Sequence, residues 1–475
     1  MNDRRTASCD IALQSMNDIQ NLPARGLRED LSALSGHLAA GRLSSAALTE
    51  RYLHAIDRTN QRLGAFTFVA AEAARAAARA ADARRAAGVA LGALDGIPVA
   101  IKANIGVRGW PYTAGLRFRQ QEIAAQDAFL VRRLRAAGAV LLGLTNMDEG
   151  ALGAEGMNPW YLTTQNPLRA GYCAGGSSSG SAAAVAADLC ALAIGTDTIG
   201  SLRIPAAFCG CASIKPSFGL VSIGGIVPVN PRFDHAGPLT RSARDLALAL
   251  AALAGFDNAC AVSVAATPVE RWPANKPVTI GYAVGFAELM VSDEIVGYYN
   301  NALATLRQLG HKLLPVDLKR WDLPKLRRAV LTLCELDMWR SHRSRLNDTP
   351  EDYSPGLRAF IRYGGKLSGD DIAGAETRIA RFYQDWHDAT AAFDAVVLPT
   401  VACTSFPLGE RRPQNTADLT AIASAAGLPA VQLPIPAATG QLPAGLQLLG
   451  RSGQDDNLIG LACSLESRWQ QDLLP

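Results

Sequence analysis

The stretch AGGSSSGSAAA at residues 174–184 is followed at once by a small-residue and apolar run, AAAVAADLCALAIG at residues 182–195. This order predicts a glycine-rich turn, then a helix of small residues, then an apolar strand. A glycine-rich turn that opens a helix presents backbone N–H groups to a negatively charged group. The stretch therefore indicates an α/β fold with a functional turn, while a flexible Gly/Ser linker is the alternative interpretation.

Short apolar runs cut by Gly and Pro continue on both sides of this stretch. They alternate with segments of helical pattern, and residues 69–87 hold almost only strong helix formers. Short apolar strands that alternate with helices predict a sheet buried on both faces. The runs are residues 97–101 (IPVAI), 139–144 (AVLLGL), 189–195 (LCALAIG), 278–284 (VTIGYAV) and 395–400 (AVVLPT).

The domain organisation follows from what separates these runs. The sequence has no Gly/Ser-rich or Pro-rich linker between two halves and no internal repeat, so we predict one large α/β domain over residues 27–475. Residues 1–26 have no clear period and are expected to form a loose N-terminal arm. Residues at about 323–390 are helix-rich and more charged, and we interpret them as a helical insertion packed on the sheet.

Composition argues against several classes of protein. The net charge is only +3 and no run of five or six like charges occurs, so nucleic-acid and membrane-surface binding find no support. The longest apolar stretch, residues 246–256, is far shorter than the roughly 20 residues that span a bilayer. The N-terminal MNDRRTASCDIALQSMND lacks the apolar segment of a secretory signal, so we expect a cytoplasmic protein. The nine cysteines show no CxxC spacing, which argues against a disulfide framework or a zinc site.

Two other functional interpretations of the Gly/Ser stretch fit the sequence less well. A phosphate-binding loop would require Gly-Lys-Ser/Thr or GxGxxG, and neither occurs there. Residues 176–180 (GSSSG) fit the G-x-S-x-G turn of α/β-hydrolases, but that turn must follow a buried strand, and the preceding TQNPLRAGYCA is polar and contains Pro. Histidines that could complete such a triad stand at His235, His311, His342 and His387.

Three separated residues form a more specific pattern: Lys102 in GIPVAIKAN, Ser177 in AGGSSSGSAAA, and Ser201 in GTDTIGSLRIP. In this order, with Ser201 placed 24 positions after Ser177, they resemble the amidase signature family. Members of that family hydrolyse carboxamides through a Ser–cisSer–Lys triad, with no metal and no cofactor. The resemblance runs over residues 43–465 and implies a single large, mixed, twisted β-sheet of about eleven strands, covered by helices on both faces.

The resemblance also assigns roles to residues. It implies that Ser201 is the nucleophile, and that Ser177, in an unusual cis conformation, relays a proton between Ser201 and Lys102. Lys102 must be neutral to act as a base, so its pKa has to fall well below about 10.4, which burial in apolar surroundings achieves. The backbone N–H groups of Thr198, Ile199 and Gly200 are expected to form the oxyanion hole, and no metal ligands are expected.

The substrate pocket is less well defined by sequence. Pocket walls in this family come from variable loops, here expected near residues 106–120 and 147–173 and from the insertion at 323–390. Within these, Met147 and Cys173 are the predicted pocket-lining residues. His235, in DHAGP at residues 234–238, is interpreted as a fixed loop residue rather than a catalyst.

Two positions depart from the commonest family pattern. Where the family usually has Asp-x-Gly-Gly-Ser, residues 197–201 read DTIGS, so Ile199 replaces a glycine. Members that act on small urea-derived acids such as allophanate are similar in tolerating a non-glycine residue there. We hypothesise that Ile199 narrows the pocket and favours small or flat substrates. Ala103 stands where the family commonly has Asp, and this loss of a carboxylate favours the neutral form of Lys102.

The sequence therefore supports one leading function and two alternatives. The leading prediction is an amidohydrolase that cleaves a carboxamide C–N bond through an acyl-enzyme on Ser201 and releases ammonia or an amine. The alternatives are the glutaminase-type component of a tRNA-dependent amidotransferase and a scaffold protein with impaired catalysis. The expected partner is a small-molecule amide, with no nucleic acid and no membrane, and a homodimer follows only from analogy at the level of the fold.

Overall fold

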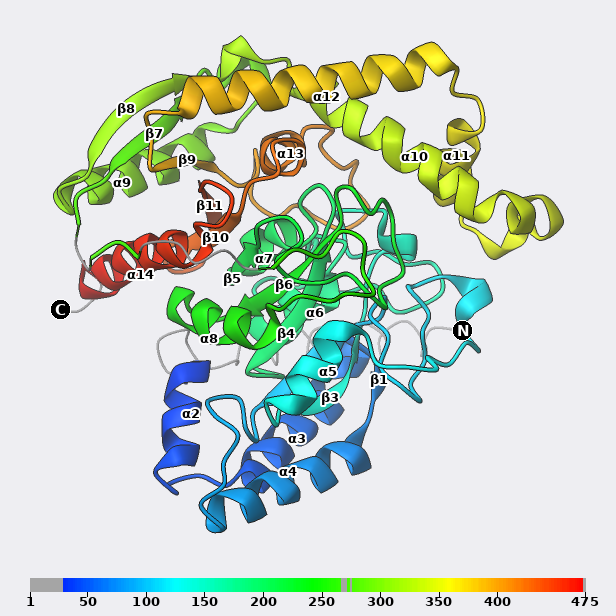
Figure 1. The fold of residues 1–475 in the computed structure, drawn as a ribbon, viewed down its shortest axis with the longest axis vertical. Coiled ribbons are helices and arrows are strands. Elements are labelled where there is room, and N and C mark those ends of the chain that lie inside the picture. Colours follow the sequence, from blue (N-terminus) through cyan, green and yellow to red (C-terminus); the bar gives the residue numbers. More distant parts are fainter. Residues whose placement is uncertain (1–28, 266–270, 274–275, 473–475) are drawn as a thin grey trace, which may run out of the picture.

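The computed structural model describes residues 29–265, 271–273 and 276–472, so the predicted arm at residues 1–26 lies outside the described part of the chain. The described residues form one eleven-stranded mixed β-sheet with helices on both faces (Figure 1). The α/β class and the mixed sheet of about eleven strands are therefore confirmed.

The sheet joins parallel and antiparallel strands. Its strands are β1 Phe66–Val69, β2 Pro98–Lys102, β3 Val140–Thr145, β4 Leu192–Asp197, β5 Ala212–Lys215, β6 His235–Thr240, β7 Thr279–Val284, β8 Lys312–Asp317, β9 Ala395–Pro399, β10 Ala430–Ile435 and β11 Ala444–Leu449. They are ordered β1-β3-β2-β4-β6-β5-β10-β11-β9-β7-β8. Strand β2 is parallel to both of its neighbours, as is β7, and the other neighbouring pairs are antiparallel.

Helices cover this sheet. The α-helices are α2 Leu31–Ala39, α3 Ser45–Leu63, α4 Ala71–Ala86, α5 Phe129–Ala136, α6 Ser179–Ala186, α7 Arg203–Cys209, α8 Ala243–Leu253, α9 Asp293–Gln308, α10 Leu323–Asp348, α11 Pro355–Gly364, α12 Gly369–Thr390, α13 Asp418–Ala425 and α14 Asp455–Asp472. Short 3₁₀ helices are η2 Arg117–Arg119, η3 Glu149–Ala151, η4 Ala287–Leu289, η5 Leu318–Arg320 and η6 Pro350–Asp352. In the described part of the chain, no helix combines the length and apolarity that crossing a bilayer requires.

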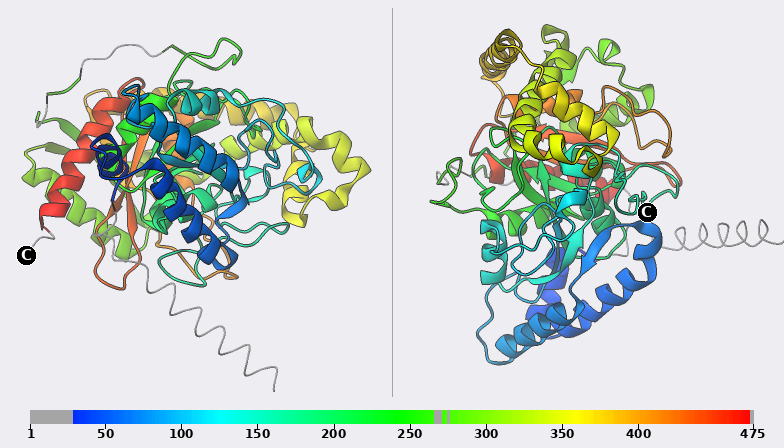
Figure 2. Two further views of the ribbon diagram at one scale, coloured as in Figure 1. Left: turned by 90° about the horizontal axis from the view of Figure 1, so that it is seen from below. Right: turned by 90° about the vertical axis from the view of Figure 1, so that its right-hand side faces the viewer.

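Residues 323–390 form the three consecutive helices α10, α11 and α12. Helix α10 packs against the other two, and the group lies at the opposite end of the molecule from α2, α3 and α4 (Figures 1 and 2). Each helix begins at a polar side chain that accepts a backbone N–H, namely Asp322, Ser354 and Ser368. Such caps satisfy donors that the first helical turn leaves unpaired, so the sequence sets the helix starts locally.

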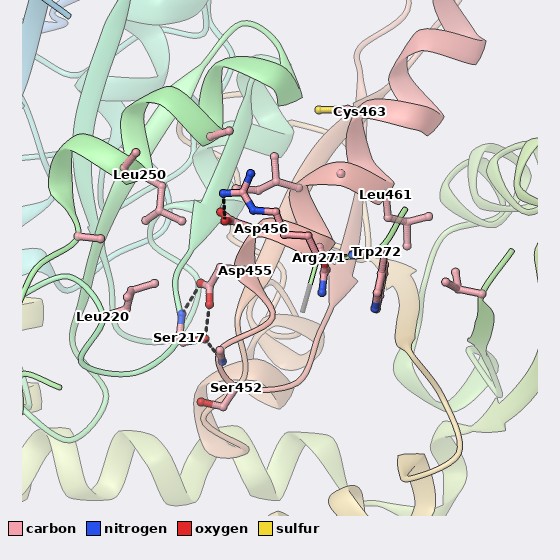
Figure 3. Close-up of a pocket in the computed structure, with 18 of the residues that line it drawn as sticks. Ser217, Leu220, Leu250, Arg271, Trp272, Ser452, Asp455, Asp456, Leu461 and Cys463 are labelled. Atoms are coloured by element: carbon pink, nitrogen blue, oxygen red, sulfur yellow. Dashed lines mark hydrogen bonds and ion pairs between the residues drawn. The ribbon is translucent and has the colours of Figure 1, made fainter. Parts of the chain in front are cut away.

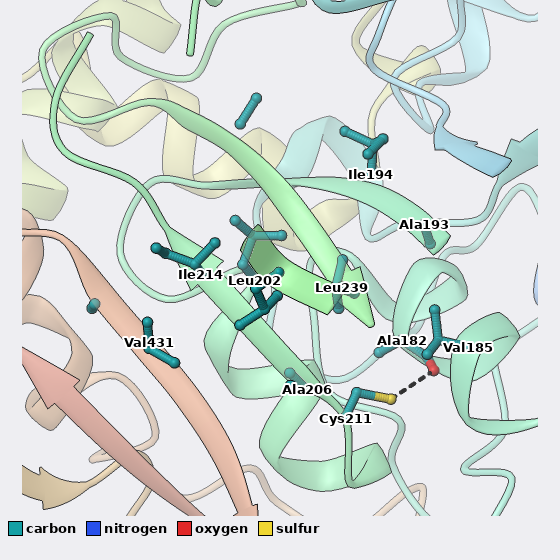
Figure 4. Packing of buried hydrophobic residues seen from close by; sticks show 14 of the residues in the cluster. Ala182, Val185, Ala193, Ile194, Leu202, Ala206, Cys211, Ile214, Leu239 and Val431 are labelled. Carbon is teal, nitrogen blue, oxygen red and sulfur yellow. Dashed lines mark hydrogen bonds between the residues drawn. The ribbon is translucent and has the colours of Figure 1, made fainter. Parts of the chain in front are cut away.

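The predicted small-residue helix is α6, and all of its residues are buried. Its Ala182 and Val185 belong to the same buried apolar cluster as Ala193 of β4 (Figure 4). Alanine side chains permit a close approach of helix and sheet. Just before β5, the Sγ of Cys211 lies 3.5 Å from the Ala182 carbonyl oxygen. This packing buries α6 against the sheet next to β4.

Strand order then brings the three predicted catalytic residues together. Lys102 ends β2, and β2 pairs in parallel with β4, which ends four residues before Ser201. The carboxyl ends of neighbouring parallel strands lie at the same edge of a sheet, which is where ligands bind in open α/β sheets. Ser177 stands two residues before α6, at the same edge.

Candidate active site

Lys102 is fully buried and surrounded by hydroxyl groups. Its Nζ lies 2.9 Å from the Oγ of Ser177, 2.9 Å from the Oγ of Ser178 and 2.8 Å from the Oγ1 of Thr196. Ser178 and Thr196 were not identified from the sequence. Ser178 Oγ also donates to the Thr196 carbonyl oxygen, so the three hydroxyls hold the lysine in one place.

The electrostatic surroundings favour a neutral lysine. Burial lowers the pKa of Lys102 to about 7, although the carboxylates of Asp148, Asp197 and Asp234 oppose this effect. A neutral amine has a lone pair that can accept a proton from a serine hydroxyl. The burial of Lys102 is therefore consistent with the prediction that its amine is neutral.

The peptide bond between Gly176 and Ser177 is cis, as the family resemblance implied. Ser177 is fully buried, and its carbonyl oxygen accepts the N–H of Asp148 at 3.3 Å. A Cβ on Gly176 would overlap the Asp148 carboxylate, so only glycine fits this position without a shift. Burial raises the pKa of Asp148 to about 7.

Ser201 is half-buried and lies between β4 and α7. Its carbonyl oxygen accepts the N–H of Ser178 at 3.2 Å, which ties the two serine segments together. Within the described chain, no hydrogen bond joins the Ser177 and Ser201 hydroxyls. Ser201 lines a cavity of about 510 Å³, together with Thr198, Ile199 and Gly200. The predicted nucleophile therefore faces a space large enough for a small-molecule substrate.

The loop over residues 198–200 is shaped by its glycine. Gly200 has a φ of +145°, and a Cβ there would lie 2.5 Å from the Thr420 Oγ1 and 2.8 Å from the Ile204 Cδ1. Ile199, which stands where the family commonly has glycine, is half-buried and lines the cavity. In the described part of the chain, the N–H groups of Ile199, Gly200 and Ser201 donate no hydrogen bond to protein, which leaves them available to a substrate oxygen.

A buried ion pair lies next to the loop at residues 198–201. Arg203 and Asp197 are both fully buried, and two guanidinium nitrogens lie 2.9 Å and 3.0 Å from the two carboxylate oxygens. Burial alone would raise the pKa of Asp197, but the Arg203 charge and hydrogen bonds lower it to about 2. Asp197 also accepts the N–H of Leu202 at 3.2 Å, so the ion pair restrains the chain on both sides of Ser201.

Three other predicted residues lie outside the cavity wall. Met147 and Cys173 are buried and are not among the described residues that line the cavity. Cys173 instead belongs to a small apolar cluster with Ala154 and Ile204, which do line the cavity. His235 is not in a loop, because it begins β6, and its Nδ1 lies 2.7 Å from the Phe233 carbonyl oxygen.

The far wall of the cavity comes from α10, α11 and the segment before α13. Lining residues within 147–173 and 323–390 agree with the expected sources of the pocket, whereas no described residue of 106–120 lines it. The lining residues outside the Ser201 loop include Glu149, Leu152, Met157, Arg327, Arg328, Leu331, Leu357, Phe360 and Arg412.

A larger cavity of about 1180 Å³ lies between α8 and α14 (Figure 3). Ser217, Leu250, Asp455 and Leu461 are among its lining residues. Lys102, Ser177 and Ser201 are absent from the described residues that line it, so size does not identify the candidate site in this molecule.

Comparison with known proteins agrees with the geometry. The sequence pattern of the family described as Amidase matches residues 47–459. The A component of the glutamyl-tRNA(Gln) amidotransferase from a Synechococcus species is 33% identical, over 91% of this chain and 96% of its own length.

Two solved structures are also similar over almost the whole chain. A crystal structure of an amidase shows a TM-score of 0.83 at 33% identity, over 93% of this chain and 100% of that chain. A protein described in a study of a vestigial complex and the origins of an s-triazine catabolic enzyme shows a TM-score of 0.86 at 30% identity, over 92% and 98%. The shared pattern, fold and lysine–serine contact lead to one conclusion. The chain belongs to the amidase signature family.

Proposed function

We propose that this protein is an amidohydrolase that cleaves a small carboxamide through an acyl-enzyme on Ser201. The observation that carries the proposal is the contact of Lys102 Nζ with Ser177 Oγ at 2.9 Å, at the sheet edge where Ser201 lines the cavity. A buried lysine with a pKa of about 7 is a suitable base near neutral pH.

The first half of the reaction forms the acyl-enzyme. Neutral Lys102 takes a proton from Ser177 as Ser177 takes one from Ser201, and the Ser201 Oγ attacks the amide carbon. The carbonyl oxygen becomes an oxyanion that accepts hydrogen bonds from the N–H groups of the 198–201 loop. The C–N bond then breaks, and the proton stored on Lys102 returns through Ser177 to the leaving nitrogen.

The second half releases the acid. Water enters in place of ammonia or the amine, passes one proton through Ser177 to Lys102, and attacks the ester carbon of the acyl-enzyme. The bond to Ser201 Oγ breaks, and the serine recovers its proton by the same relay. The products are a carboxylic acid and ammonia or an amine.

A small substrate is part of the proposal. Ile199 places a branched side chain in the cavity wall where the family commonly has glycine. The similarity to a protein described in connection with s-triazine catabolism supports compact, nitrogen-rich substrates such as carboxylated ureas. The proposal of a small substrate thus rests on this similarity and on the Ile199 side chain in the cavity wall.

The second candidate function is the glutaminase component of a tRNA-dependent amidotransferase. The 33% identity to the A component of such an enzyme, over 96% of that relative's length, favours it. Ile199 argues for the stand-alone hydrolase, because it adds a branched side chain to the cavity wall beside Ser201. Glutamine hydrolysis that rises sharply when the other components are added would favour the amidotransferase.

The test is ammonia release over a panel of amides by the wild-type protein and by Ser201→Ala. The panel contains carboxyureas, short aliphatic amides, aryl amides and glutamine. We expect release from at least one small amide, and its loss in Ser201→Ala. Full turnover by Ser201→Ala would refute the proposal. Failure of a serine-directed fluorophosphonate to label the wild type at Ser201 would support the impaired scaffold instead.

A further inference from the structure

We propose that the cavity beside Ser201 is a carboxylate-recognition site, in which Arg412 and Arg328 hold the anionic end of the amide substrate. The inference rests on the proposed function and extends it from carboxylated ureas to small amides that carry a carboxylate, and it names the residues that bind this group. The scissile amide lies at Ser201, and the acid group lies at the arginine-bearing wall.

The first argument is the charge of the cavity wall. Of its described lining residues, three are arginines (Arg327, Arg328 and Arg412) and one, Glu149, is acidic. Glu149 is only 4% exposed, and its Oε1 accepts hydrogen bonds from the Trp160 indole and the Ser354 N–H. The charged groups that this wall presents to a ligand are therefore mainly guanidinium groups.

The second argument is the position of the carboxylates that pair with these arginines. Arg327 Nε lies 2.5 Å from Asp418, and Arg328 contacts Glu335. Both acidic side chains are 4% exposed and do not line the cavity, whereas the Arg328 side chain is 45% exposed. The ion pairs thus place negative charge behind the wall and positive charge at its surface.

Of the three arginines that line the cavity, Arg412 has the weakest ion-pair contact with the protein. Its Nε lies 3.9 Å from the Glu155 Oε1, beyond hydrogen-bonding distance, and its side chain is 47% exposed. A guanidinium carries five N–H donors and matches a carboxylate in a two-bond geometry. The residue therefore has donors to spare, and a carboxylate is the ligand group they fit best.

The guanidinium group of Arg328 is restricted in orientation by its protein contacts. Its guanidinium carbon lies 5.2 Å from the centre of the Tyr363 ring, and it also contacts Thr332 Oγ1 at 3.3 Å. Stacking on the ring and pairing with Glu335 restrict its orientation, so less freedom is lost when it binds an anion. Replacing it would leave Glu335 buried without its partner, so Arg412 is the better position for a test.

The experiment compares isosteric amides that differ in charge. Ammonia release is measured from oxamate, malonamate and succinamate, and from the neutral diamides oxamide, malonamide and succinamide. In the wild type we expect kcat/KM for the best acid to exceed that of its diamide by about tenfold or more. In Arg412→Gln we expect the acid to lose most of this advantage through KM, while kcat/KM for the diamide changes less than about threefold.

Matched variants separate recognition from structure. Arg412→Lys keeps the charge and should retain part of the preference for acids. Arg58→Gln alters an exposed arginine on α3 that does not line the cavity, and it should leave kcat/KM unchanged for both acids and diamides. Equal loss of both classes in Arg412→Gln would assign a structural role and overturn the proposal, as would equal kcat/KM for acids and diamides in the wild type.

A binding measurement keeps the inference separate from catalysis. Malonate and succinate are titrated calorimetrically into Ser201→Ala and into Ser201→Ala/Arg412→Gln. We expect both dianions to bind Ser201→Ala, and their affinity to fall about tenfold or more in Ser201→Ala/Arg412→Gln. The affinity for malonamide should not change comparably. Malonate binding without turnover of any amide would refute the proposed function and leave the anion site standing. Absence of dianion binding would overturn the anion site, even in an active amidase.

Discussion

The Oγ1 of Thr198 donates a 2.6 Å hydrogen bond to the Oδ1 of Asp234, and this bond ties the loop at residues 198–201 to the segment that precedes β6. The other oxygen of Asp234 accepts the N–H groups of Val229 and Asn230 at 2.8 Å and 3.0 Å. Asn230 in turn donates through Nδ2 to the Asp337 carboxylate on α10 at 2.9 Å. The helix that carries Arg327 and Arg328 is thus connected to the loop before Ser201 by two buried side chains.

Removal of this link should slow the chemical step. Asp234→Ala leaves the Thr198 hydroxyl and two N–H groups without their acceptor, and we expect kcat to fall about 10- to 100-fold with a small change in KM. Asp234→Asn keeps one acceptor oxygen and should recover much of this loss. Steady-state kinetics on one small amide measures both, and an Asp234→Ala variant with wild-type kcat would show that the link has no role in catalysis.

The activity should rise with pH through about 7. Lys102 must be deprotonated to accept a proton, and burial lowers its pKa to about 7, so the protonated and inactive form prevails below that value. The expected profile of log kcat/KM climbs with pH on its acidic side and then levels off. A rate that stays flat from about two pH units below this pKa to about two above it, with Ser201 still required, would contradict the role of the lysine.

Asp148→Asn should move that profile to lower pH. The Asp148 carboxylate favours the charged form of Lys102, so its removal lowers the pKa of the lysine further. The acidic limb of log kcat/KM is therefore expected to shift downward in pH, while the plateau stays within a few fold of the wild type. An unchanged or upward shift, measured on the same substrate and buffers, would show that Asp148 does not act on Lys102 electrostatically.

Ile199→Gly should broaden the range of amides. The isoleucine side chain lies in the cavity wall next to Ser201, and glycine would remove its volume. We expect the ratio of kcat/KM for bulky aryl amides to that for short aliphatic amides to rise about tenfold. Both kinds of amide are measured with the wild type and with Ile199→Gly. An unchanged ratio would show that Ile199 does not determine specificity.

Arg203→Gln should destabilise the fold as well as the site. Arg203 is fully buried and pairs with the fully buried Asp197, whose carboxylate would remain without its counter-charge. Breaking a buried pair from one side typically costs about 3–5 kcal/mol. We expect the urea concentration at the midpoint of unfolding, monitored by tryptophan fluorescence, to drop clearly. The control variant Arg58→Gln, on the exposed face of α3, should leave this midpoint unchanged.

Local patterns predicted much of the architecture. The apolar runs at residues 97–101, 139–144 and 189–195 became β2, β3 and β4 within a few residues at their ends, because apolar side chains and flanking glycines act over short distances. Less regular stretches were missed: β6 contains Gly and Pro, and its first residue, His235, was expected in a loop. Such strands form because neighbouring strands hold them, as β4 and β5 do for β6.

The amino-acid sequence alone was enough to predict the fold class, the family and the candidate residues Lys102, Ser177 and Ser201, because these depend on residue types in a fixed order. Only the tertiary structure placed Ser178 and Thr196 on the lysine, Asp234 on Thr198, and Arg412 in the cavity wall. These contacts join segments that are far apart in the sequence, and no local pattern encodes them. They exist because one sheet brings distant strand ends to a common edge, and because α10 and α11 close over that edge.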